Sequence, residues 1–229
     1  MTVESVTYIS DLDSTYPAEA EVGTLHEGND HLRNIKSAIT TTFPNISAAV
    51  SASASELNVL DGITATTAKL NAPTLATLQA ATSGTEIDFT SIPAWVTRIT
   101  VMFQAVSTNG ASPPLIQIGD AGGIETAGYS SVSSLVADSV ATGAGGSSAG
   151  FNLQAGSAAN TITGAITLTL MNAATNLWVA SGTLSPTNVA GTIQVAGYKA
   201  LSATLDRVRI TTVNGTDAFD NGSINILYE

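Results

Sequence analysis

The stretch TRITVMFQA, residues 97–105, decides how the second half of this chain folds. Ile99, Val101, Phe103 and Ala105 occupy every second position, and most of the residues between them are polar. A period of two is that of a β-strand with one buried face, because successive side chains point to opposite sides of a sheet. We therefore expect a half-buried strand here.

Outward from that stretch, the same signal returns along the rest of the chain. Alternation is found again in residues 207–211 and 224–228. Other strand-like runs are residues 115–118, 151–154, 161–171, 177–181 and 193–198. Turn-forming residues separate them: Asn109-Gly110, Gly119-Asp120, Gly122-Gly123, Gly143 to Gly146, Ser185-Pro186, Asn214-Gly215 and Asn221-Gly222. About eight strands with frequent turns predict a mainly β fold over residues 84–229, an antiparallel, jelly-roll-like β-sandwich.

Residues 29–43 have the period of a helix instead. Steps of three and four separate the apolar residues Leu32, Ile35, Ile39 and Phe43, which places them on one helical stripe. Asn29 or Asp30 can cap the start of this helix, and Pro44 predicts its end. A single helix of this length is marginal alone, so the stripe must pack against a partner or against copies of itself.

The first thirty residues are acidic and contain no Lys or Arg. Their carboxylates are Glu4, Asp11, Asp13, Glu19, Glu21, Glu27 and Asp30. Few apolar residues are present to offset the entropy of ordering, which favours a solvated, partly extended arm. The alternative is an acidic docking segment that orders only against a basic partner.

Residues 47–82 are rich in Ala, Ser and Thr and contain a short repeat. Glu56-Leu57-Asn58 recurs as Lys69-Leu70-Asn71. Leucine and isoleucine residues continue the apolar series around both copies: Leu57, Leu60, Ile63, Leu70, Leu75 and Leu78. The pattern is no sustained heptad, so short kinked helical turns around a symmetry axis fit better than a coiled coil. A disordered linker remains the alternative. We divide the chain at residues 1–46, 47–83 and 84–229.

Composition excludes several classes of function. With 7 Lys and Arg against 18 Asp and Glu, the net charge is −11, which disfavours nucleic-acid binding. No apolar run approaches the roughly 18 residues of a membrane span. The first residues, MTVESVTYISDLDS, lack the basic start and apolar core of a signal peptide. The absence of Cys rules out disulfides and thiolate sites.

The sequence contains no convincing catalytic or metal-binding motif. Its two His, His26 and His31, both precede the strand region, so a Ser-His-Asp triad cannot form there. The carboxylates of the strand region lie mostly in turns, where Asp caps its own backbone. Residues 214–222 lack the spacing of a calcium loop, and Gly143 to Gly146 lacks the lysine of a phosphate loop. We expect no enzyme activity, no cofactor and no bound metal.

The neutral polar loops are the candidate binding surface. Trp178, Phe103 and Tyr228 lie in strand patterns and are expected in the core, whereas Tyr129 follows a glycine-rich loop and is the better exposed candidate. A glycine-rich loop around Gly145 is expected to be mobile. The predicted receptor-binding residues are Asn109, Tyr129, Gly145, Asn214 and Asp217.

Three regions resemble fibre proteins of tailed bacteriophages. The N-terminal stretches are YISDLD (8–13), GNDHLRNIK (28–36) and TFPN (42–45). The motif SELNVLDGI (55–63) is similar to the short repeat of fibre shafts. Four further stretches resemble a C-terminal domain of such fibres: IDFTSIP (87–93), RITVMF (98–103), QIGDAGGI (117–124) and GY (128–129).

This resemblance implies attachment to other tail or capsid proteins through residues 1–46, then a short trimeric shaft and a distal β-domain. It assigns the attachment and trimer contacts to the apolar residues Leu32, Ile35, Ile39, Phe43, Leu57, Leu60 and Leu70. The implied function is adsorption: a homotrimer on the virion surface binds a host glycan or protein. A structural or decorating virion protein without a receptor role is the alternative. A depolymerase is disfavoured, because neither a β-solenoid nor a carboxylate pair is evident.

Overall fold

The computed structural model describes residues 25–43, 53, 55, 73–137, 140–154, 157–187 and 189–229. The chain divides into two compact units, residues 1–64 and residues 65–229. We call the second one the β-unit. The predicted contact residues Leu57, Leu60 and Leu70 lie outside the described residues.

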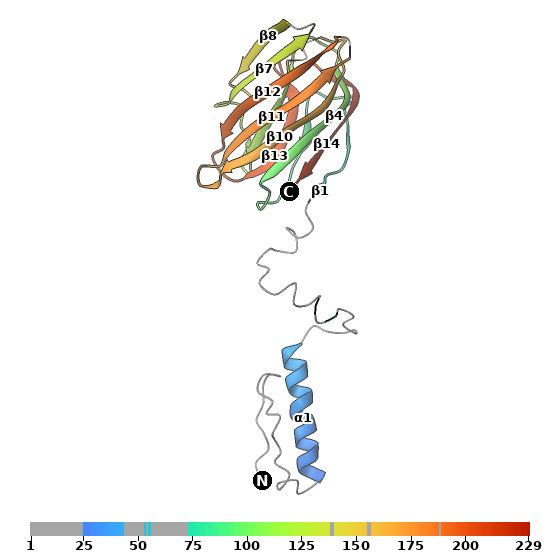
Figure 1. Ribbon diagram of the computed structural model, residues 1–229, viewed down its shortest axis with the longest axis vertical. Helices are drawn as coiled ribbons and strands as arrows, with labels where there is room; N and C mark the ends of the chain where they lie inside the picture. The colour runs from blue at the N-terminus through green and yellow to red at the C-terminus, as the bar shows by residue number, and fades with distance from the viewer. Residues whose placement is uncertain are drawn as a thin grey trace. The chain divides into compact units, whose positions relative to one another are not determined.

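In the first unit, helix α1 spans Leu25–Thr42 (Figure 1). It begins before the predicted caps, so the assignment of Asn29 or Asp30 as N-cap is wrong. Asp30 is instead inside the helix, where its carboxylate lies 3.5 Å from the Arg33 guanidinium three residues later. The predicted end is confirmed: the last turn closes with the Phe43 N–H donating to Ile39 O at 3.0 Å.

The apolar stripe of α1 faces solvent. Leu32, Ile35, Ile39 and Phe43 are 56%, 39%, 47% and 48% exposed, although Ala38 on the same helix is fully buried. A helix in a globular protein buries its apolar stripe. This helix therefore presents a face that lacks a packing partner among the described residues.

The β-unit consists of two antiparallel sheets (Figure 1). The nine-stranded sheet has the order β1-β14-β4-β10-β11-β12-β7-β8, with β2 also paired to β14. Its strands are β1 (Thr74–Leu75), β2 (Gln79–Ala80), β4 (Arg98–Thr108), β7 (Ser130–Ala137), β8 (Val140–Ser147), β10 (Ile162–Asn172), β11 (Leu177–Pro186), β12 (Gly191–Ala200) and β14 (Phe219–Tyr228). A short 3-10 helix, η3 (Ala173–Thr175), joins β10 to β11.

The five-stranded sheet has the order β3-β13-β5-β6, with β9 also paired to β5. Its strands are β3 (Ile87–Phe89), β5 (Pro114–Asp120), β6 (Gly123–Ile124), β9 (Phe151–Asn152) and β13 (Leu205–Thr212). The two sheets share one hydrophobic core, in which Ile166 and Trp178 of the larger sheet belong to the same cluster as Ile116 and Val208 of the smaller.

The predicted mainly β, antiparallel fold is confirmed, and each predicted strand is present with somewhat different bounds. Phe103 and Trp178 are buried as expected, whereas Tyr228 is only partly buried against the core. Thr74–Leu75 and Gln79–Ala80 already pair with β14, so the sheet begins before the boundary expected at residue 84.

The expected loop at Gly143 to Gly146 is instead part of a strand. β8 pairs along its length with β7, including Gly145 opposite Ser133. Glycine weakens a strand but does not prevent pairing at a sheet edge, where few side chains need to pack. The glycine run was therefore a misleading loop signal.

The expected turn at Asn221-Gly222 is a bulge inside β14. Gly222 has a φ of 94°, and a Cβ there would lie 2.4 Å from Ala105 O on the facing strand. Ala105 itself has a positive φ of 51°, and its carbonyl accepts a 2.7 Å hydrogen bond from Asn221 Nδ2. Irregularities on both strands thus end the regular alternation that began at Ile99.

Candidate functional site

Three of the predicted receptor residues lie in two loops that meet, residues 109–113 and 213–218. The Asn109 N–H donates to Ala218 O at 2.9 Å, and Asn109 Oδ1 accepts from the Ala218 N–H at 2.9 Å. Asp217 accepts from Asn214 Nδ2 at 2.7 Å and from the Ser112 N–H at 2.9 Å. The structure therefore brings Asn109, Asn214 and Asp217 together.

Their polar atoms hold the two loops to each other. The hydrogen bond from Asn214, and next the one from the Ser112 N–H, lowers the pKa of Asp217 below its ordinary value. Asn214 Oδ1 accepts from the Thr216 N–H at 3.0 Å and from Thr212 Oγ1 at 2.8 Å. These side chains build the loop cluster, and the hydrogen bonds within it fix their orientation.

The expectation that Tyr129 is exposed is wrong. Its side chain is 5% exposed, and its ring packs edge-on against Phe151 with centroids 5.1 Å apart. Tyr129 Oη accepts from the Ile118 N–H at 2.7 Å and lies 2.9 Å from the Glu125 carbonyl, to which it can donate. Burial raises the pKa of its hydroxyl. Tyr129 completes the hydrogen bonding of β5 and offers almost no surface to an outside ligand.

Replacing Tyr129 by phenylalanine should lower the free energy of unfolding by about 1–3 kcal/mol, because the buried Ile118 N–H would lose its acceptor. Urea unfolding of the full chain measures this. Phe151→Leu serves as the packing control, because it removes the ring contact but keeps the Tyr129 hydroxyl and its hydrogen bond. An unchanged unfolding free energy for Tyr129→Phe would contradict the assigned role.

A partly buried ion pair lies beside Tyr129, with the Lys199 side chain 7% exposed and the Glu125 side chain 22% exposed. Lys199 Nζ pairs with the Glu125 carboxylate and lies 5.5 Å from the centroid of the Tyr129 ring. Glu125 Oε1 also accepts from the Ser202 N–H at 2.7 Å, and Ser202 Oγ donates to Asp120 at 2.6 Å. The network fastens the loops after β5, β6 and β12 to one another.

Gly145, the last predicted residue, lies apart from the loop cluster. A Cβ at this position would lie 2.2 Å from Gln154 Oε1, so Gly145 sits against that side chain rather than in an open loop. Of the predicted receptor-binding residues, Asn109, Asn214 and Asp217 thus lie together, Tyr129 lies in the core, and Gly145 lies in a strand.

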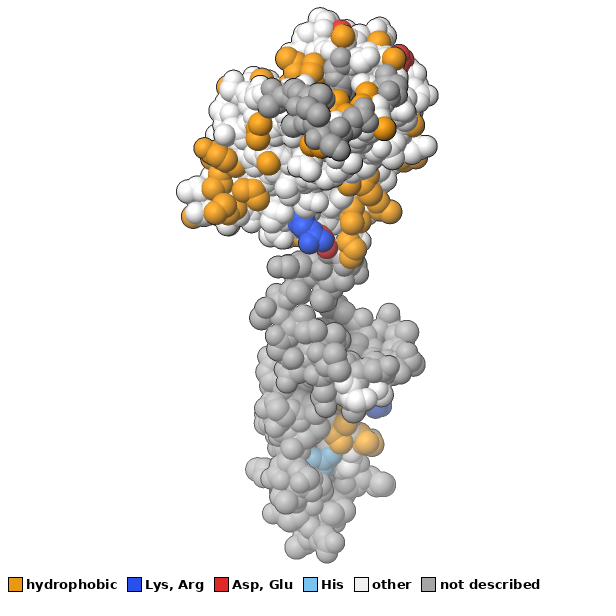
Figure 2. Space-filling view, turned by 45° about the horizontal axis from the view of Figure 1, so that its top comes forward, with side chains coloured by type: hydrophobic (Ala, Val, Ile, Leu, Met, Phe, Trp, Pro, Cys, Tyr) orange, Lys and Arg blue, Asp and Glu red, His pale blue; other side chains and the backbone are white. Residues whose placement is uncertain are grey.

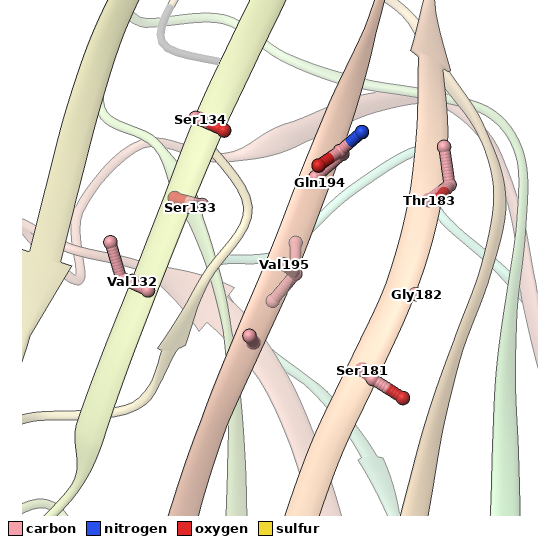
Figure 3. Close-up of a pocket in the computed structure, with 9 residues that line it drawn as sticks. Val132, Ser133, Ser134, Ser181, Gly182, Thr183, Gln194 and Val195 are labelled. Carbon is pink, nitrogen blue, oxygen red and sulfur yellow. The ribbon is translucent and has the colours of Figure 1, made fainter.

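A groove that sequence reasoning missed lies on the outer face of the nine-stranded sheet (Figure 3). It encloses about 360 Å³ over β7, β12 and β11. Two rows of side chains cross these strands in register: Ser134, Gln194 and Thr183 in one row, and Val132, Ala196 and Ser181 in the other. Strand alternation places both rows on the solvent side.

The hollow arises from small residues. Ser133, Val195 and Gly182 lie between the two rows, and the side chains of Ser133 and Val195 are buried. A Cβ at Gly182 would lie 2.4 Å from Ala165 O of β10, so close strand approach requires glycine there. Short side chains at Ala196 and Ser181 leave the space above this floor open.

The outer face around the groove carries almost no charge. Along the outward positions of β4, β7, β10, β11 and β12 that the structure describes, Arg98 is the one charged residue, and it pairs with Glu229. The smaller sheet differs: Arg209 of β13 pairs with Asp88 and Glu86 at 2.6 Å each. Figure 2 likewise shows a largely uncharged visible face on the β-unit.

Comparison with known proteins gives no relative: no protein family, curated protein or solved structure matches the chain. Within the described part of the chain, no helix is long and apolar enough to cross a membrane. No group of three or more His, Asp or Glu that could hold a metal is found in those residues.

Proposed function

We propose that this chain is a non-enzymatic fibre protein of a tailed-phage virion. Residues 1–46 attach it to other tail or capsid proteins, the Ala/Ser/Thr-rich segment forms a short trimeric shaft, and the β-unit, a jelly-roll-like sandwich, presents a surface for host adsorption. One observation carries the proposal: the helix leaves its apolar stripe open, whereas the β-unit closes its own core.

The helix supports the attachment half of this function. An isolated helix of this length is marginal in water, and exposed apolar side chains gain free energy when they are buried. Copies of the stripe packed together, or docked on another virion protein, would supply that burial. The chain then needs assembly at one end and has a self-sufficient unit to present.

The β-unit supports the adsorption half. An acidic chain with a net charge of −11 is repelled by anionic surfaces such as acidic polysaccharides. Its large sheet offers an outer face nearly free of charge, which suits a neutral glycan or an uncharged protein surface on the host cell.

Adsorption competition tests the proposal. Purified full chain is added to sensitive cells before the phage whose genome encodes it. We expect saturable inhibition of phage adsorption, because the chain would occupy the receptors. Chain that is folded and assembled but leaves adsorption unchanged at any concentration would contradict the receptor role.

A structural or decorating virion protein is the second candidate. The loop cluster favours it, since Asn109, Asn214 and Asp217 bond to their own loops and need no receptor. Labelling of the chain on intact virions separates the two functions. Labels on the capsid or at a tail joint would favour the structural role, and labels at the distal end of a fibre would favour adsorption.

A further inference from the structure

We infer that the groove over β7, β11 and β12 is a binding site for a neutral oligosaccharide. The inference deepens the proposed function and rests on it, because it names the receptor chemistry and moves the site from the loops to the sheet. The groove is defined by the two outward rows, Ser134–Gln194–Thr183 and Val132–Ala196–Ser181.

The polar groups of the groove are free to bind a ligand. Within the described residues, the side chains of Ser134, Ser181, Thr183 and Gln194 make no hydrogen bond to the protein. Three hydroxyls and one amide offer both donors and acceptors, which is the set that sugar hydroxyls require. In the loop cluster, by contrast, several polar atoms already bond one loop to the other.

Apolar contacts complete the site. Val132, 51% exposed, and Ala196 form the apolar part of the second row. Tyr198 follows Ala196 by two residues on the same face of β12, about 7 Å further along the strand, and is 53% exposed. An exposed tyrosine ring offers an apolar face with a polar end, a suitable surface for the C–H face of a sugar ring.

Size and charge then restrict the ligand. A volume of about 360 Å³ falls at the lower end of the roughly 300–1,000 Å³ range of small-ligand sites. No lining residue is charged, and the acidic chain repels anions. A short, neutral, hydroxyl-rich chain fits these conditions.

Isothermal titration of the full chain with neutral oligosaccharides released from the surface of sensitive cells tests the inference, with the anionic fraction as comparison. Tyr198→Ala removes the ring, and Ala196→Arg fills the groove from an exposed position that does not reach the core. We expect saturable binding of the neutral fraction and a loss of affinity of roughly tenfold or more in both variants. Val213→Ala, at a similarly exposed apolar residue in the loop cluster, should bind like wild type.

Each outcome separates the two proposals. Adsorption blocked by a chain that binds no neutral oligosaccharide would overturn the groove as a glycan site and keep the adsorption function. Neutral binding without blocking would keep the site and overturn adsorption. The inference would be overturned if Ala196→Arg bound with full affinity or if the chain preferred the anionic fraction. It would also be overturned if Ala196→Arg had a lower oligomer mass than wild type, because that result would place a second copy of the chain on this face.

Discussion

Replacing Glu125 by glutamine should lower the free energy of unfolding of the β-unit by about 2–3 kcal/mol, at or below the effect of breaking a fully buried ion pair, because the Glu125 side chain is 22% exposed. The Lys199 side chain is only 7% exposed, so its ammonium would remain in the interior without an anion. Chemical unfolding of the full chain, followed by the fluorescence of buried Trp178, measures the change.

Two further variants make this prediction specific. Glu125→Gln combined with Lys199→Met removes both charges. The double variant should recover most of the lost stability, since no buried charge is left without a partner. Arg98→Met breaks a surface pair with Glu229, in which the arginine is 55% exposed, and should change stability by less than about 1 kcal/mol. Equal losses in the surface and buried variants would contradict the role given to burial.

The same network predicts how stability depends on pH. Burial alone would raise the pKa of Glu125, but Lys199 and the Ser202 N–H more than offset it, so the pKa lies below its ordinary 4.5. The Ser202 hydroxyl, followed by the Gly122 N–H, lowers the pKa of Asp120 below 3.8. Carboxyls with a lowered pKa stabilise the fold above their ordinary values and lose that contribution as the pH falls. The stability gap between wild type and Glu125→Gln should therefore shrink below about pH 4.5.

The strands with strong alternation were predictable, and those built from small residues were not. Ile99, Val101 and Phe103 carry enough apolar contrast to reveal which face is buried. Most of the paired residues of β7 and β8 are Ser, Gly or Ala, whose small side chains give little contrast between the two faces. Pairing with neighbouring strands determines that these segments are strands, and the local sequence pattern does not predict it.

The candidate site was harder to predict because it depends on register. Asn109 and Asn214 could be named from turn chemistry alone, and their convergence follows from the ends of β4 and β14 lying side by side. Tyr129 looked exposed because it follows a glycine-rich loop, but only the fold brings Ile118 within reach of its hydroxyl. The groove residues Ser134, Thr183 and Gln194 become neighbours solely through strand pairing.

The helix stripe leads to the second large expected effect. Ile39→Asp should shift the proposed trimer to a monomer at micromolar concentration. Burying an isoleucine side chain contributes about 1.5–3 kcal/mol, which is roughly ten- to a hundredfold in association per chain, and a buried carboxylate adds a desolvation penalty. Every protomer carries the change, so the effects combine. Analytical ultracentrifugation of wild type and variant measures it.

Ser37→Asp is the matched control, because Ser37 is exposed on the same helix but lies off the stripe of Leu32, Ile35 and Ile39. It adds the same charge with little change in helix propensity, so assembly should persist if the stripe is the contact. A trimer in both variants would place the contact elsewhere in the chain, and a monomeric wild type would overturn the proposed trimer.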